Sequence, residues 1–456
     1  MDNTNNLVQA VDIILFKALQ FIAALSILVF VHELGHFMWA RIFKVRVEKF
    51  YLFFDTKSFA FLRWKPRGSD TEYGIGWIPL GGYCAISGMV DETHDAGDLG
   101  DKVEPWEFRA KGPFARFMIM FGGVLNNIIL ACIIYICLVW NYGYDKLELQ
   151  NLKNGMVYSE YAQSIGFQNG DIICEIDGEI AEDNSFRNSL LLGCNATVLR
   201  NGERVDIIFP DTIGQVFLRD QQELINFAMP RFPMVIAEAV EGGPAFLAGL
   251  QTGDSIVGVE GIKTQYVDEV KAMLAKQAGD TTAISFYRGD SLMIADLVVK
   301  ADSTIGVMLK PGITEADYTH IDFSLAEAIP AGISRGWEML YNYVRQFKLV
   351  FTKEGAQSLG GFGTMGSVFP ETWSWMTFWS ITAFFSVALA FMNILPIPGL
   401  DGGHIFILII ETIIRRPISD KAKEIAMYIG FGLIIALMLF ANGNDIWRFI
   451  IKPFVS

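Results

Sequence analysis

Four stretches of the chain are apolar enough and long enough to cross a membrane as helices. They cover approximately residues 18–43, 113–140, 374–395 and 424–441, and the third is followed by another apolar stretch, "IFILIIETII". A helix needs about 20 apolar residues to span a hydrocarbon core of roughly 30 Å. The pattern therefore predicts four spanning helices, and an even number puts both termini on one side of the membrane.

The chain begins with a polar and acidic segment, "MDNTNNLVQAVDIILFKALQ". This segment lacks the positively charged region of a signal peptide, and it leads into an apolar stretch longer than a signal peptide carries. We therefore expect a retained first membrane helix.

Basic residues flank the first and third loops between the predicted spans. Lys and Arg are enriched in short loops on the cytoplasmic side. We therefore expect loops one and three in the cytoplasm, and residues 142–373 with both termini on the far side. The basic residues concerned are Arg41, Lys44, Arg46, Lys49, Arg109, Lys111, Arg116, Arg415, Arg416, Lys421 and Lys423.

The far-side region contains an internal repeat. "SIGFQNGDIICEIDGEI" (164–180) aligns with "LAGLQTGDSIVGVEGIK" (247–263) at a constant offset of 83. Each copy is predicted to hold a short helix, a glycine turn and a β-branched strand after "GD". The recurring residues are Gly166, Gln168, Gly170, Asp171 and Gly178, matched by Gly249, Gln251, Gly253, Asp254 and Gly261.

This repeat resembles the PDZ domain, most closely in "GGPAFLAGLQTGDSIVGVEG". An unrelated pair of small β-rich domains is the alternative. PDZ domains add an extended peptide to the edge of a sheet. The resemblance therefore implies a peptide or a substrate ectodomain as partner.

The stretch "LVFVHELGHFMWARIF" (28–43) places ionisable residues inside the first predicted span. His32 and His36 are four apart, so both imidazoles leave one face of a helix, as a metal requires. Glu33 lies on an adjacent face, where it can reach a water beside the metal. Ionisable groups in a membrane helix are costly unless paired or ligated. Zinc suits imidazole and carboxylate ligands, so these residues predict a zinc site. The alternative interpretation is a structural one, in which the histidines pack against polar groups of neighbouring helices.

A third ligand must come from elsewhere in the chain. "MNILPIPGLDGGH" (392–404) ends the third span, and its prolines and glycines break the helix. Irregular backbone at membrane depth is tolerated where it is buried in protein or lines a watery cavity. Asp401 and His404 are both candidates, and the spacing does not choose between them. Both halves of the site lie toward the cytoplasmic ends of their spans, at similar depth.

Between the first two spans, "VEKFYLFFDTKSFAFLRW" and "TEYGIGWIPLGGYC" are aromatic and β-branched, separated by "KPRGSD". They predict β-strands close to the membrane, joined by a turn. The resulting sheet either only packs loops, or presents a free strand edge that holds an unwound substrate in extended form.

HExxH in the first span, Asn-x-x-Pro-x-Pro-x-Leu-Asp-Gly in a later span and the PDZ-like repeat between them resemble the bacterial site-2 protease family of intramembrane zinc metalloproteases. The resemblance extends from the first span to the fourth. It implies one Zn²⁺ per chain held by His32, His36 and Asp401, with Glu33 as general base. It also implies substrate contacts at Asn393, at Gly81 and Gly82 of "IPLGGY", and at Asn127 of "GGVLNN", with Asn126 as the alternative.

The implied fold is a membrane α-helical core of about four transmembrane helices with a membrane-associated β-loop, plus two tandem PDZ (α+β) domains. "FSLAEAIPAGISRGWEML" (323–340) resembles the family's helix before the third span, whereas "LGGFGTMGSVFP" (359–370) lacks an expected proline. That departure puts in doubt how the segment closes over the site. The domains expected are 1–145 with HExxH and the β-loop, 146–230 and 231–310 as PDZ domains, 311–373 as linker, and 374–456 with the last two spans.

By the same resemblance, the substrate is a single-span protein of the bacterial inner membrane, such as an anti-sigma factor already shortened by a first protease. The PDZ pair lies on the periplasmic side and excludes bulky ectodomains. A metal transporter or metal-sensing receptor is the alternative, but it would favour several carboxylates along the spans. The spans hold few besides Glu33, Asp401 and Glu411. A non-catalytic PDZ scaffold would leave Glu33 without a role.

Composition agrees with a membrane protein that carries some soluble mass. The chain is 52% hydrophobic and only 19% charged, and its net charge of −14 is concentrated in the middle. No clustered basic face is present, so nucleic acid is not an expected partner. The five cysteines form no CxxC pair, which argues against a cysteine zinc site, although Cys174 and Cys194 could pair if that region is exported.

Overall fold

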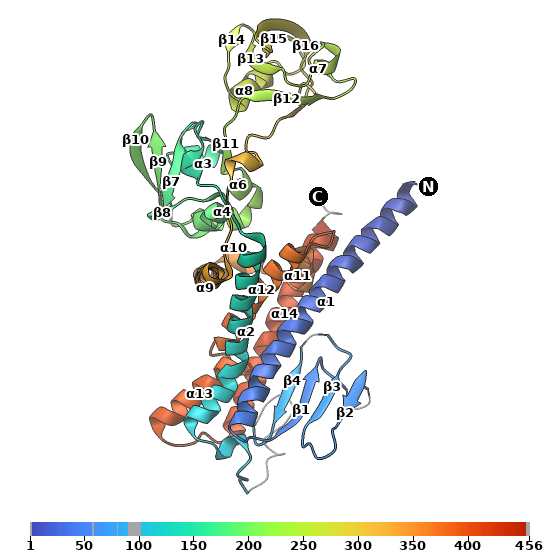
Figure 1. Ribbon diagram of the computed structural model, residues 1–456, viewed down its shortest axis with the longest axis vertical. Helices are drawn as coiled ribbons and strands as arrows, with labels where there is room; N and C mark the ends of the chain where they lie inside the picture. The colour runs from blue at the N-terminus through green and yellow to red at the C-terminus, as the bar shows by residue number, and fades with distance from the viewer. Residues whose placement is uncertain (1, 57–58, 80, 90–101, 453–456) are drawn as a thin grey trace. The chain divides into compact units, whose positions relative to one another are not determined.

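The computed structural model describes all residues except 1, 57–58, 80, 90–101 and 453–456. The chain forms two compact units, each described by itself (Figure 1). The helical unit comprises residues 1–144 and 322–456, and the β unit comprises residues 145–321.

Four helices are long and apolar enough to cross a membrane, among the residues that the structure describes. They are α1 (Asp2–Ile42), α2 (Pro113–Tyr142), α12 (Trp375–Ile394) and α14 (Asp420–Ile446), which continues as a π-helical segment over Trp447–Ile451. Apolar helices therefore occur at all four positions where spans were predicted. Local residues set the ends: Pro113 begins α2, and Gly143, at φ +64°, follows it.

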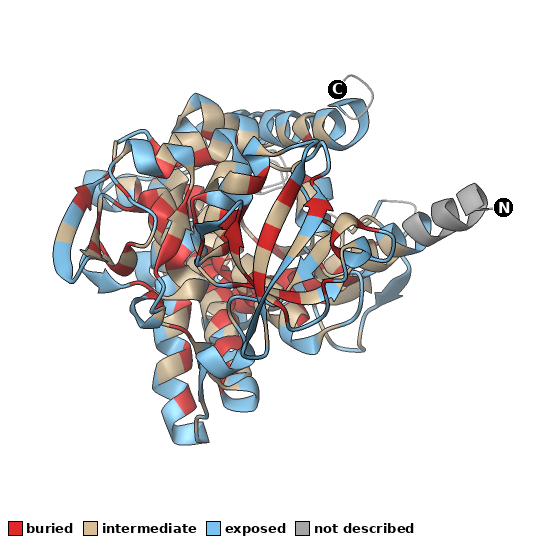
Figure 2. Ribbon diagram, turned by 90° about the horizontal axis from the view of Figure 1, so that it is seen from above, coloured by how far each residue is buried: buried red, intermediate tan, exposed pale blue. Residues whose placement is uncertain are grey.

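These helices expose large apolar side chains to their surroundings. Exposed residues are pale blue in Figure 2. Those on α14 include Leu439, which is 66% exposed. A water-soluble bundle would bury such side chains, whereas lipid solvates them. With their length and apolarity, this exposure makes the chain a membrane protein.

The third span ends in a sharp break before a separate helix. Pro396 and Pro398 interrupt the backbone after α12, and Gly399 has φ +93°. The apolar stretch that follows belongs to α13 (Asp401–Ile414). A Cβ atom at Gly402 would lie only 2.3 Å from the carbonyl oxygen of Leu395, so the fold-back requires glycine there.

The predicted helix in residues 323–340 is confirmed as α9 (Leu325–Phe347). Its first turn is closed by a capping box in which Ser324 and Glu327 bond each other's backbone. α9 packs against α2, since a Cβ atom at Gly332 would lie 2.5 Å from the backbone nitrogen of Ile136. This contact leaves room only for glycine.

The stretch 359–370, which lacks the expected proline, follows α10 (Lys353–Ser358) and contains α11 (Phe362–Ser367). Asp445 of α14 anchors it, because its Oδ2 accepts the backbone N–H groups of Gly361 and Thr364 at 3.0 and 2.9 Å. A buried carboxylate on the fourth span therefore holds this segment.

The two aromatic stretches between the first spans form one four-stranded sheet, as predicted. Each stretch supplies two strands, in the order β2-β3-β1-β4, with β1 and β3 parallel. The strands are β1 (Val47–Leu52), β2 (Leu62–Trp64), β3 (Glu72–Ile75) and β4 (Tyr83–Ile86). β4 bonds β1 and is the last strand on that side of the sheet among the described residues.

The β unit contains two lobes with the same order of elements, except for two helices found in the first alone. The first lobe (146–230) holds β6 (Met156–Tyr158), α3 (Glu160–Ser164), β7 (Ile172–Ile176), β8 (Glu179–Ile180), α4 (Asp183–Leu192), β9 (Asn195–Arg200), β10 (Glu203–Ile208), α5 (Ile213–Arg219), α6 (Gln221–Asn226) and β11 (Ala228–Pro230). The second lobe (231–310) holds β12 (Met234–Ala239), α7 (Pro244–Leu247), β13 (Ser255–Val259), β14 (Ile262–Lys263), α8 (Val267–Lys276), β15 (Thr281–Arg288), β16 (Ser291–Val298) and β17 (Val307–Leu309). Outside the lobes, β5 (Tyr144–Lys146) pairs with β18 (Thr319–Ile321).

The repeated glycines and aspartates serve the same purpose in both lobes. All six repeated glycines have positive φ, which confirms the predicted turns. Asp171 accepts a hydrogen bond at 2.6 Å from Arg200, and Asp254 accepts one at 2.8 Å from Arg288. Both aspartates are buried, so each arginine neutralises a charge removed from water. The repeat did not reveal these arginines.

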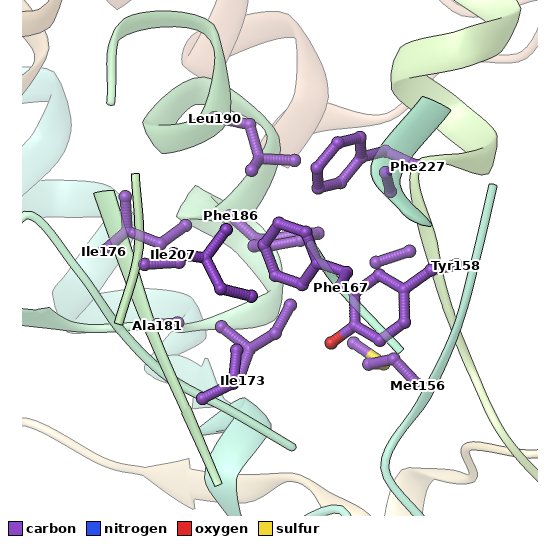
Figure 3. Packing of buried hydrophobic residues seen from close by; sticks show 14 of the residues in the cluster. Met156, Tyr158, Phe167, Ile173, Ile176, Ala181, Phe186, Leu190, Ile207 and Phe227 are labelled. Carbon is purple, nitrogen blue, oxygen red and sulfur yellow. The ribbon is translucent and has the colours of Figure 1, made fainter. Parts of the chain in front are cut away.

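Each lobe has its own apolar core. Figure 3 shows that of the first lobe, where Phe167 lies among Tyr158, Phe186 and Phe227. Cys174 is buried and Cys194 is exposed, and both are free thiols. The pairing that the sequence left open for these two cysteines is therefore not formed in this structure.

Candidate metal centre

Two histidines of α1 and one carboxylate of α13 converge at a single point. Nε2 of His32 lies 3.3 Å from Nε2 of His36 and 3.2 Å from Oδ2 of Asp401, and Nε2 of His36 lies 3.3 Å from Oδ1 of Asp401. Both histidines are buried. Among the described residues this is the one group of three with metal-ligand spacing, and His404 is outside it.

The donor set fits zinc. Oδ2 of Asp401 is buried and accepts no hydrogen bond from the described part of the chain, although carboxylate oxygens are normally satisfied when removed from water. Two imidazoles and one carboxylate are ligands of catalytic zinc sites, which keep a further position open. A cation between these atoms would satisfy the orphaned oxygen.

Contacts behind the histidines fix their orientation. Nδ1 of His36 donates to the carbonyl oxygen of Ile119 at 2.8 Å, which leaves the Nε2 lone pair facing Asp401. Nδ1 of His32 lies 3.2 Å from the side-chain amide of Asn127, whose Oδ1 has no partner. With that amide turned over, Oδ1 accepts the Nδ1 proton and Nε2 of His32 is likewise free to ligate.

Glycines allow α2 to approach the HExxH turn closely. A Cβ atom at Gly35 would lie 2.1 Å from the carbonyl oxygen of Gly122, and one at Gly123 would lie 2.5 Å from Nε2 of His36. Side chains at these positions would separate the helices or displace the imidazole. The "GGVLNN" segment therefore shapes the space around the histidines.

The cluster opens into a cavity of about 280 Å³. Glu33, next to His32 in the chain, lines it, and so do His404 and β4 residues at the sheet edge. A Cβ atom at Gly82 would meet Val29 at 2.7 Å and Glu33 at 3.5 Å, so glycine lets this segment lie beside Glu33. One cavity therefore holds the converging ligands, a carboxylate and residues of the last strand of the sheet.

The remaining predicted site residues separate into two groups. Asn393, Gly81 and Gly82 line the cavity, and the amide of Asn393 lies 3.2 Å from Nε2 of His32. Asn127 is fully buried and its amide contacts His32, so the structure places it behind the ligand, and its contact with substrate stays a prediction. Asn126 donates to the carbonyl oxygen of Val31 at 3.3 Å. Residue 80 of "IPLGGY" lies outside the described residues.

Two features of the site escaped the sequence analysis. The carbonyl group of Ile119 leaves no side-chain signal, because any residue supplies it. The second feature is a charge cluster in which buried Glu411 bonds Arg116 at 3.0 Å and Lys423 at 2.8 Å. This cluster joins α2, α13 and α14 beside the cavity, and only tertiary contact brings its members together.

Comparison with known proteins agrees with this geometry. The family model of peptidase family M50 matches residues 20–437. A protein of Neisseria meningitidis named "Putative zinc metalloprotease" is 26% identical over 94% of this chain and 98% of its own length. The "Regulator of sigma E protease" of Haemophilus influenzae is 25% identical over 94% of this chain and 98% of its own length. A "Putative zinc metalloprotease" of Campylobacter jejuni is 28% identical over 95% of both chains. The chain therefore belongs to peptidase family M50, the site-2 proteases, and is a membrane zinc metalloprotease.

Proposed function

We propose that the protein hydrolyses a peptide bond within or near the transmembrane segment of a single-span membrane protein, with one zinc ion held by His32, His36 and Asp401. The observation that carries this proposal is the cavity in which Asp401 of α13 meets His32, Glu33 and His36 of α1, a helix long and apolar enough to span a membrane. A site on such a helix favours a substrate that itself lies in the membrane.

Glu33 is the general base in this proposal. Bound zinc would supply Lewis acidity, which polarises the scissile carbonyl and lowers the pKa of water. Glu33 takes a proton from the attacking water as its oxygen bonds the carbonyl carbon. Glu33 then delivers that proton to the leaving nitrogen as the carbon–nitrogen bond breaks, giving a carboxylate and an amine.

β4, the last strand of its sheet among the described residues, would hold the substrate in extended form. A transmembrane helix hides its carbonyl groups in internal hydrogen bonds, so it must unwind before attack, and the freed groups need new partners. β4 borders the cavity through Tyr83, Cys84 and Ile86. Strand addition there supplies those partners, with the Asn393 amide as a further one.

The two lobes act as PDZ domains on the periplasmic side of the bacterial inner membrane. Their shared order of elements, glycine turns and buried aspartate–arginine pairs support this assignment. The "Regulator of sigma E protease" among the relatives supports an anti-sigma factor already shortened by a first protease as substrate class. The lobes would exclude intact ectodomains.

The test replaces the proposed base and leaves the ligands in place. We expect Glu33→Gln to retain zinc and to lose cleavage of a synthetic transmembrane peptide in liposomes by about a hundredfold or more. Exposed Glu371 provides the control, because Glu371→Gln removes a distant carboxylate. Metal analysis and mass spectrometry of the products read out both effects. Appreciable cleavage by Glu33→Gln would exclude the assignment.

A second variant tests whether Asp401 is a zinc ligand. Asp401→Ala should lose both zinc and cleavage, whereas a transporter that uses the same ligands would move zinc across liposomes without cutting the peptide. Zinc flux without cleavage by the wild-type protein would replace the protease proposal with the transporter.

A further inference from the structure

The two lobes present equivalent edge strands. Among the described residues, β17 is the last strand of the sheet in the second lobe, and β11 pairs only with β6 in the first. Before the edge strand, the carbonyl oxygen of Gly306 accepts the N–H of Val240 in the second lobe, and that of Phe227 accepts the N–H of Ser159 in the first. After the edge strand, the N–H of Lys310 donates to the carbonyl oxygen of Val235 in the second lobe, and that of Arg231 donates to Gly155 in the first. These bonds place Met229 and Met308 at the same position of the two strands.

The direction of the backbone N–H and C=O groups alternates along each strand, and this determines which of them are available to hydrogen-bond another chain. In antiparallel pairing, successive residues point their N–H and C=O groups alternately toward and away from the partner strand. Since Gly306 and Lys310 bond toward β12, Val307 and Leu309 point outward. By the same reasoning, Ala228 and Pro230 point outward from β11.

Proline therefore removes an outward donor in the first lobe alone. Pro230 has no N–H group, whereas Leu309 at the equivalent position has one. Proline on an edge strand is a known means of blocking strand addition. The second lobe keeps both outward donors, and the first keeps one.

The segment that precedes the edge strand also differs between the two lobes, and it too favours strand addition in the second lobe. Residues 299–306 lead into β17, and Gly306 adopts φ +72° beside Gly243. In the first lobe, residues 209–227 lead into β11 and form α5 and α6. Phe217 of α5 packs on Phe227 with ring centroids 5.3 Å apart, and both are buried in the core that includes Leu190 of α4 (Figure 3). A helix of the lobe itself therefore packs against both α4 and the residue that precedes β11.

We propose that only the second lobe binds extended polypeptide, which adds as a strand to β17, and that the first lobe is closed by Pro230 and α5. A protease of this kind meets polypeptide substrates, and an edge strand bonds main chain whatever its sequence. This inference rests on the proposed peptide-recognition role of the lobes and adds to it which lobe recognises.

The test exchanges the two equivalent residues in the full-length protein in nanodiscs. Peptides are selected from a phage-displayed library of random peptides, and their affinities are measured by fluorescence polarisation. Leu309→Pro should weaken peptide binding about tenfold. The proline removes one backbone hydrogen bond to the peptide and strains the hydrogen bond beside it. The reciprocal Pro230→Leu should leave binding unchanged. Because Leu309 points outward and the first lobe tolerates proline there, β12–β17 pairing should survive.

A second measurement does not depend on the folding of Leu309→Pro. A photo-crosslinking amino acid at Met308 should label the selected peptides, and one at Met229 should not, although the two side chains are 58% and 49% exposed. Peptides N-methylated at alternate residues should lose binding to the wild-type protein. Failure to select peptides, equal labelling at both positions, or tolerance of N-methylation would overturn the inference. Zinc content and cleavage of the synthetic transmembrane peptide, measured on the same preparations, report separately on the protease proposal.

Discussion

At the scale of single residues, the site depends on positions that carry no side chain. The imidazoles of α1 meet Asp401 because α2 lies unusually close, and this closeness needs glycine at 35, 122 and 123. The three ligand residues alone do not ensure metal binding, because each donor atom must lie within a few tenths of an ångström of its ideal distance from the metal.

Gly123→Ala tests this dependence. The added Cβ atom would lie 2.5 Å from Nε2 of His36 and 2.6 Å from Cε1 of His32, so one imidazole must move. We expect zinc affinity to fall about tenfold to a hundredfold, as when contacts that orient ligands are lost. Competition with a chelator measures it. Gly432→Ala on α14, where a Cβ atom meets nothing within 4 Å, is the matched control; equal affinities of the two variants would contradict the explanation.

At the scale of elements, each lobe contains a buried ion pair between an aspartate and an arginine. The repeat in the sequence identifies the aspartate of each pair but not the arginine. Asp254 is 1% exposed, and hydrogen bonds from Arg288 hold its pKa below the usual range. A carboxyl whose pKa is lowered by folding stabilises the fold above its unfolded pKa, and this stabilisation is lost as pH falls through the folded value.

Arg288→Met should therefore destabilise the second lobe by about 3–5 kcal/mol at neutral pH, because a buried carboxylate loses its partner. The difference from wild type should shrink on acidification, since a protonated Asp254 needs no cation. Hydrogen exchange across residues 234–309 measures it. Arg204→Met removes the exposed pair with Glu175 and should cost less than about 1 kcal/mol. A deficit at Arg288 that does not change with pH would argue against the ion pair as its cause.

At the scale of the whole molecule, the distribution of basic residues fixes the expected orientation in the membrane. Loops with excess Lys and Arg stay in the cytoplasm. An alkaline phosphatase inserted at Gly242, a turn of the second lobe, should be active, because that enzyme matures only in the periplasm. The same insertion at Gly68, between β2 and β3, should be inactive. Activity at Gly68 would reverse the proposed sidedness.

The sequence by itself determined what depends on residues near one another in the chain. Twenty apolar residues specify a span, a spacing of four puts His32 and His36 on one helix face, and "GD" after a glycine turn marks each lobe. These are local properties of helix and strand geometry, and the structure has apolar helices, the HExxH helix and the glycine turns at the predicted places, although the first and fourth apolar helices are longer than predicted.

Tertiary structure decided what depends on how separate elements are placed. Asp401, and not His404, joins the cluster because the break at Pro396–Gly399 sets the rotation and depth of α13 against α1. Asn127 turned out to lie behind His32, since helix rotation places its amide there. No spacing in the chain encodes the distance between two helices, because packing fixes it. Thus the sequence specified which groups could form a metal site, and only their packing brought three of them within reach of one ion.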